Sequence, residues 1–375
     1  MLRFSEKGRK YWRICGYLFF AFTVTATVLA VTFLAAARAA QPRFRPITEP
    51  LPPGLSARID QIPGYRRDED ATYLTFVEWY LVFNPQEYAQ FIEKNPPSRF
   101  PYFCGIRQIW SSYVDVYGIA RRYYRFNAGY NLMLVVIGTS STVEFAIKGT
   151  YEKTVGRIFE WSASGESTSE DRFAAKVARA YGEFIPTRPW FEFPFGHELV
   201  ELWSTTGFFG RHFPRKCERK FFLSVEYGVK SIYAAVIRLA SRAIFGIADT
   251  EIYLSARGVS DLSLHRPHVR RVQQLGNGHW ILAVPHYQGF TDTIPVLARD
   301  GLEFDEIAGN DEMLLTVVAP AGWSYNLTAG QPLFTMPLLT GESQRIAVQV
   351  PIKSLSHVLR EIDAKHLRLE HLFDF

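Results

Sequence analysis

The segment 280–308, WILAVPHYQGFTDTIPVLARDGLEFDEIA, holds the pattern that decides the fold class of this chain. An apolar run ends at a Pro-His pair, a helical pattern follows, and a second apolar run begins at Leu302. The same order of strand, proline, helix and strand returns around Pro351. The expected elements are strands at 280–286, 302–308, 313–319, 345–350 and 367–373 and helices at 290–299 and 354–365. Two such βαβ-type units predict an α+β, ferredoxin-like sandwich over residues 251–375.

Residues 71–250 show helical spacing and no convincing run of alternating strands. The stretch TYLTFVEWYLVFNPQEY predicts a helix that begins at Asn84. Asn84 can cap this helix, Pro85 suits its first position, and Glu87 can complete a capping box. Longer helical stretches are expected within 104–161 and 215–245. We therefore predict a mainly helical middle domain.

The N-terminal end predicts a membrane anchor within residues 1–40. Residues 14–37 contain no charge, and as a helix these 24 residues span roughly 36 Å, enough for a hydrocarbon core of about 30 Å. A secretory signal has an apolar region of only about 7 to 15 residues, so we favour a retained anchor. Ala37-Arg38-Ala39 has the form of a cleavage site, and cleavage stays the alternative. Residues 41–70, rich in Pro and Arg, are interpreted as an extended stalk.

The charge distribution disfavours a nucleic-acid partner. The net charge of +5 comes from residues 1–50, which hold eight Lys or Arg and two Glu, and leave 34 basic and 35 acidic residues in the body. Basic residues before the apolar segment keep the N-terminus cytoplasmic under the positive-inside rule. We therefore expect a single-pass membrane protein whose body is exported, in a periplasmic or other extracytoplasmic compartment.

Residues 128–147 form the second possible crossing. They contain the apolar run LMLVVI, then small and hydroxyl residues, and one carboxylate, Glu144. A charged residue at the centre of a span costs about 2.5 to 3.5 kcal/mol, whereas each strongly apolar residue returns only about 0.3 to 0.6 kcal/mol. We favour a buried or bilayer-facing helix of the exported domain, in which Glu144 is a paired or exposed structural acid. A second crossing is the alternative.

The helix expected at 215–245 is both amphipathic and basic. Apolar residues recur at three- and four-residue steps, and charged residues lie opposite them. The favoured interpretation is that the apolar face packs into the helical domain while the charges stay hydrated. Alternatives are a groove on a partner protein or an anionic bilayer surface. The basic residues that would meet lipid are Arg219, Lys220, Lys230, Arg238 and Arg242.

Few residues have the spacing of a reactive site. In GHELVEL, His197 and Glu201 could share a helical face as in zinc proteases, but acidic residues are also common in a first helical turn. His286, with Asp292 downstream, could form an acid/base pair. No phosphate-binding, dinucleotide or nucleophile-elbow motif occurs. We expect no cofactor and no bound metal. His265, His268, His279 and His286 form a histidine cluster in which His265 and His268 have metal-like spacing, but Pro267 and two flanking arginines disfavour a metal site. Cys104 and Cys217 could form one disulfide.

Three functions follow from these features. The favoured one is a membrane-anchored accessory or assembly protein, not an enzyme, whose exported body binds a protein partner or the membrane surface. The second is a membrane-surface enzyme that uses Glu144, His197, Glu201 or His286. The third is a multi-pass transport component, which requires that 128–147 cross the bilayer.

Overall fold

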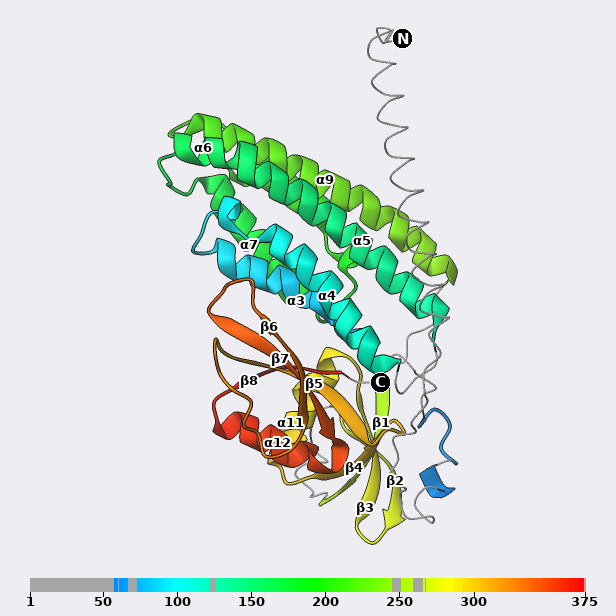
Figure 1. Cartoon of the computed structure of the whole chain (residues 1–375). Helices are drawn as coiled ribbons and strands as arrows, with labels where there is room; N and C mark the ends of the chain where they lie inside the picture. Colours follow the sequence, from blue (N-terminus) through cyan, green and yellow to red (C-terminus); the bar gives the residue numbers. More distant parts are fainter. Residues whose placement is uncertain are drawn as a thin grey trace.

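The computed structural model, shown in Figure 1, describes two short segments near the N-terminus and most of the chain from residue 73 onward. The described residues are 57–59, 61–66, 73–121, 126–244, 251–258, 266 and 268–373, with the backbone alone for 240–244. The anchor expected within 1–40, most of the stalk and His265 lie outside these residues.

The N-terminal half of the described chain is helical, as the sequence predicts. Its helices are α3 (Thr75–Ile92), α4 (Tyr102–Ala120), α5 (Ala128–Tyr151), α6 (Arg157–Ser162), α7 (Ser169–Phe184), α8 (Phe195–Thr205) and α9 (Phe213–Ile244). A π-helical turn, η2 (Glu152–Gly156), joins α5 to α6, and 3₁₀ turns lie at Pro97–Arg99 and Trp190–Glu192. α3 and α7 pack together, as do α4 and α5.

The prediction that the first helix begins at Asn84 is wrong. α3 begins at Thr75, and Pro85 lies inside it. Proline in a helix interior removes a backbone hydrogen bond. Here the first two turns bury Phe76 and Tyr80 against the rest of the protein, and this burial offsets the loss. The helix ends at Ile92, shortly before Pro96 and Pro97.

The C-terminal half contains two four-stranded antiparallel sheets, so the α+β class is confirmed. The first sheet contains β1 (Glu251–Arg257), β2 (Arg270–Gly276), β3 (His279–Pro285) and β4 (Glu303–Ile307) in the order β2-β3-β1-β4. The second contains β5 (Glu312–Pro320), β6 (Gln331–Pro337), β7 (Ser343–Pro351) and β8 (Arg368–Phe373) in the order β6-β7-β5-β8. Helix α11 (Gln288–Arg299) precedes β4, and α12 (Ile352–Ala364) precedes β8. The two predicted strand-helix-strand units therefore belong to different sheets. In both sheets the strands lie side by side in the same order, with the second strand in sequence next to the third, then the first and the fourth.

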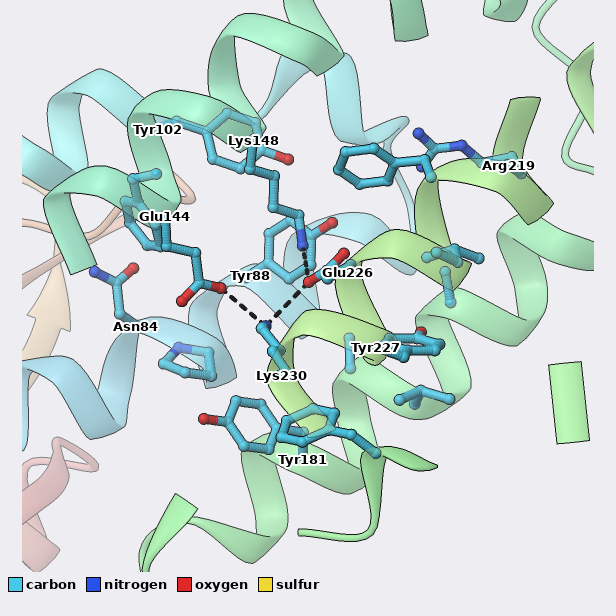
Figure 2. Close-up of a pocket in the computed structure, with 18 residues that line it drawn as sticks. Asn84, Tyr88, Tyr102, Glu144, Lys148, Tyr181, Arg219, Glu226, Tyr227 and Lys230 are labelled. Atoms are coloured by element: carbon cyan, nitrogen blue, oxygen red, sulfur yellow. Dashed lines mark hydrogen bonds and ion pairs between the residues drawn. The ribbon is translucent and has the colours of Figure 1, made fainter. Parts of the chain in front are cut away.

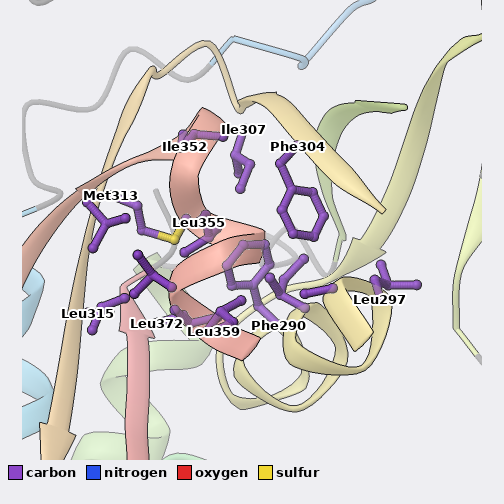
Figure 3. Close-up of a cluster of buried hydrophobic side chains, with 14 of the residues drawn as sticks. Phe290, Leu297, Phe304, Ile307, Met313, Leu315, Ile352, Leu355, Leu359 and Leu372 are labelled. Atoms are coloured by element: carbon purple, nitrogen blue, oxygen red, sulfur yellow. The ribbon is translucent and has the colours of Figure 1, made fainter. Parts of the chain in front are cut away.

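One apolar core joins both sheets to α11 and α12. Figure 3 shows Phe290 of α11, Leu355 of α12 and Leu315 of β5 meeting in it, and all three are fully buried. Alternation along β5 sends Leu314 to the other face of the sheet, where it packs against α3. This contact places the helical half on the second sheet.

A buried ion-pair cluster strengthens the same interface. The Arg345 guanidinium on β7 lies 2.8 Å from the Glu87 carboxylate on α3 and also pairs with Glu370 on β8. Glu87 accepts a further hydrogen bond from the backbone N–H of Leu339. The helical half is therefore held to the sheet by charged groups as well as by apolar contacts.

Candidate functional site

Helices α5 and α9 form the face of the helical half that lies farthest from the sheets (Figure 1). The two helices run antiparallel, as the order of the ion pairs between them shows. Glu144 pairs with Lys230 at 2.8 Å, Lys148 with Glu226 at 2.9 Å, and Glu152 with Arg219 at 2.8 Å. Long side chains thus bridge the two helices along several turns.

The central bridge is a cluster of four alternating charges, drawn in Figure 2. Glu226 accepts hydrogen bonds from Lys148 at 2.9 Å and from Lys230 at 3.0 Å, and Lys230 also pairs with Glu144. Glu144 is the most accessible member, with 46% of its side chain exposed. Burial alone would raise the pKa of Glu226, but the two ammonium groups hold it well below its usual range. The cluster has no net charge.

A cavity of about 70 Å³ lies beside this cluster, between α3, α5, α7 and α9. Four tyrosines line it together with the charged residues: Tyr88, Tyr102, Tyr181 and Tyr227. Burial raises the pKa of Tyr181 to about 12, so its phenol stays protonated at neutral pH. Each lysine already has a carboxylate partner, so the cavity offers no surplus cation to an anionic ligand.

A second charged network lies at the π-helical turn. Arg219 pairs with Glu152 and Glu218, and Arg215 pairs with Glu218 and with Asp171 at 2.9 Å. All but Asp171 are buried. A Cβ atom at Gly156 would lie 2.5 Å from the Glu152 carboxylate, so glycine makes room for this acid. Charged residues therefore line the inner face of α9 from Arg215 to Lys230, about four turns of helix, together with the buried Leu223 and Tyr227.

The outer face of α9 is apolar and exposed. Its exposed residues follow steps of three and four: Phe221, Val225, Val229, Ile232, Val236 and Leu239. Exposure reaches 61% at Val229 and 75% at Leu239. The continuous helical segment of α5, η2 and α6 exposes Leu132, Val136, Val143, Ile147, Ile158 and Trp161. These two sets are called the outer apolar face below.

This arrangement reverses the favoured expectation for the long helix. Its apolar stripe was expected to pack inward with its charges hydrated, but only Phe222 and a few neighbours turn toward the core. Arg219 and Lys220, two of the expected lipid contacts, are buried, and Lys230 lies within the four-charge cluster. Arg238 is exposed and donates to the Phe191 carbonyl at 2.6 Å. The Arg242 side chain lies outside the described residues.

The predicted reactive residues do not converge. His197 is 71% exposed and 3.8 Å from Glu201, whose carboxylate pairs with Lys176 at 2.6 Å. The described residues contain no group of three ligands suited to a metal. Asp292, the expected partner of His286, accepts from Gln288. His279 pairs with Asp305 at 2.8 Å, His268 is exposed, and Cys104 and Cys217 are free thiols.

The ion pairs between α5 and α9 were not predicted, although the sequence carries part of the signal. Glu144, Lys148 and Glu152 recur every four residues and so share one face of α5. Which carboxylate meets which cation depends on how the helices pack. Comparisons with protein-family models, curated protein sequences and solved structures find no match to this chain. Among the described residues, the one helix long and apolar enough to cross a membrane is Ala128–Ser162.

Proposed function

We propose that this chain is a membrane-bound accessory or assembly protein whose outer apolar face lies in one leaflet of a bilayer. The observation that carries the proposal is the reversed polarity of α5 and α9, which turn ionisable groups toward each other and apolar groups outward. Large exposed apolar surfaces mark protein or membrane contacts, and ionisable residues in lipid face the interior of a helix bundle. Segment 14–37 would add an anchor.

The neighbouring helices favour insertion parallel to the membrane over a crossing. α7 packs against α3 and α9, and it exposes Arg172, Lys176 and Arg179. A crossing of α5 and α9 as they are packed here would carry these cations into or close to the hydrocarbon, at a cost of about 2.5 to 3.5 kcal/mol each at its centre. With α5 and α9 lying in the surface, α7 stays in water. This argument disfavours the multi-pass transport alternative.

The C-terminal half would supply the partner site of an accessory protein. In our proposal each four-stranded unit is a ferredoxin-like repeat, because each has two central antiparallel strands and a crossover helix before its last strand. β2 and β6 are edge strands, paired on one side only. A strand of a partner could extend either sheet through backbone hydrogen bonds. β2 lies at the end of the molecule opposite α9, whereas β6 packs beside α3 and α4, so we favour β2 as the edge that can bind a partner while the outer apolar face lies in a membrane (Figure 1).

Depth measurements on the full chain test the membrane contact. With Cys15, Cys104 and Cys217 changed to serine, an environment-sensitive fluorophore is attached at Val229→Cys on the outer apolar face or at Ala180→Cys on the exposed side of α7. In liposomes we expect blue-shifted emission and quenching by nitroxide-labelled lipid at position 229 but not at 180. Emission typical of water at position 229 would reject the proposal.

A further inference from the structure

The outer apolar face ends in a cluster of exposed aromatic residues on the loop between α8 and α9. The loop reads Gly207-Phe208-Phe209-Gly210, and Phe209 is 79% exposed. Its rings contact neighbouring rings, with centroids 5.2 Å apart for Phe208 and Phe209 and 5.8 Å apart for Phe209 and Phe213. Exposed Trp203 stacks on Phe208 at 6.3 Å. Water does not favour such a cluster, whereas aromatic rings are enriched at the headgroup level of a bilayer.

Two cations without a carboxylate partner among the described residues lie at the same end of the molecule. Lys153 in η2 and Arg157 in α6 are exposed, and they flank Gly156, whose carbonyl accepts a hydrogen bond from Arg215 in the first turn of α9. Arg157 lies 5.7 Å from the Trp161 ring. No carboxylate in the described part of the chain lies within ion-pair distance of either cation. By contrast, Arg211 in the aromatic loop pairs with Glu166 at 2.7 Å.

We infer that the phosphates of anionic phospholipids bind Lys153 and Arg157 while the Phe208–Phe209 loop inserts among the lipid glycerol groups. This inference rests on the proposed function and adds a headgroup preference and an orientation to it. Two cations without carboxylate partners in the described chain complement an anionic surface, and each basic residue near such a surface strengthens the contact roughly fivefold. A soluble anion could bind the two cations, but it would give the exposed Phe208 and Phe209 rings no apolar environment to insert into. In this orientation the α6 end of the outer apolar face lies at the depth of the lipid headgroups.

The test uses the full chain in the same cysteine-free background, with the fluorophore at Phe209→Cys. Vesicles contain phosphatidylcholine alone or with phosphatidylglycerol as a minor component. We expect quenching by shallow nitroxide lipids, and a higher ratio of inserted to free probe when phosphatidylglycerol is present. Lys153→Gln with Arg157→Gln should remove this increase, roughly fivefold for each residue. The matched pair Lys176→Gln and Arg179→Gln on α7 should leave it intact.

Two outcomes separate this inference from the proposal beneath it. If the probe at 229 is quenched by lipid but the probe at 209 ignores phosphatidylglycerol or the Lys153 and Arg157 changes, the headgroup site is rejected and the membrane contact stands. If both probes report water, both are rejected. Loss of the phosphatidylglycerol effect at high salt would support the site, because salt screens contacts between exposed charges.

Discussion

The C-terminal half and the α5–α9 pair of this molecule have opposite polarity. In the C-terminal half, Phe290 and Leu355 are fully buried. In the α5–α9 pair, Val229 and Leu239 are mostly exposed, and Arg219 and Glu152 are the buried residues. The first arrangement is the one that water favours for a folded chain, and in our proposal the second reflects contact with lipid. Periodicity along a helix therefore defines two faces, but the surrounding solvent decides which one points inward.

The largest effect is expected from removing the centre of the four-charge cluster. Glu226→Gln leaves Lys148 and Lys230, whose side chains are only 13% and 19% exposed, with Glu144 alone to neutralise them. Breaking a buried pair by removing one partner costs about 3 to 5 kcal/mol of unfolding free energy. Denaturant unfolding in detergent measures it. The control is Glu201→Gln on α8, whose pair with Lys176 is exposed and whose loss should change little. Equal effects of the two changes would mean that the inner face of α9 is not a charged core.

Truncation of one leucine to alanine in each region compares the C-terminal core with the outer face of α9 directly. Leu355→Ala removes a fully buried side chain from the C-terminal core, and Leu239→Ala removes an exposed one from α9. We expect the first to lower the unfolding free energy by about 2 to 5 kcal/mol, because it leaves a cavity, and the second by less than about 0.5 kcal/mol. Thermal and denaturant unfolding of both variants in detergent provide the measurement. A large loss at Leu239 would indicate a covered, not an open, outer face.

A pH effect should arise where the two halves meet. His371 on β8 is buried, its ring lies 3.5 Å from the Trp79 ring, and its Nδ1 is 2.8 Å from the Thr291 hydroxyl. Burial, helped by nearby His286, lowers the pKa of His371 well below its usual value. The folded state then binds fewer protons than the unfolded one, so stability falls as pH drops below about 6.5.

A glutamine substitution isolates this contribution. Between pH 7 and 5 we expect His371→Gln to lose about 2 kcal/mol less stability than the unchanged chain, because glutamine does not titrate. Stability curves at several pH values measure the difference, with exposed His268→Gln as the control. The depressed pKa of Glu226 acts in a separate window, since its contribution is lost only as pH falls below about 4.3. Identical slopes for both chains between pH 7 and 5 would contradict the assignment to His371.

The sequence predicted strands best where an apolar run is also buried in the core. Residues 280–286 were recognised as a strand because they form an apolar run, and 345–350 because apolar residues recur at Ile346, Val348 and Val350; both strands are largely buried and central in their sheets. β2, RRVQQLG, was missed because it is an exposed edge strand, and β6 was missed because it carries Pro332 and Pro337. β1, EIYLSAR, was also missed, although it is a central and largely buried strand. The contact between Lys148 and Glu226 joins residues 78 apart in sequence, and only tertiary packing brings them together.

The smallest effect on stability should come from placing a charge on the outer apolar face. Val229→Lys puts an ammonium group at a position that is already exposed, so the unfolding free energy in detergent should change by less than about 0.5 kcal/mol. In liposomes the same change opposes burial of this face in lipid. A fluorophore at Val236→Cys, seven residues further along the same stripe, should therefore lose part of its quenching by nitroxide lipid. Ala180→Lys on α7 should change neither quantity. If Val229→Lys leaves the quenching at 236 intact, the outer face of α9 does not contact lipid at that depth, and its apolar stripe requires a protein neighbour instead.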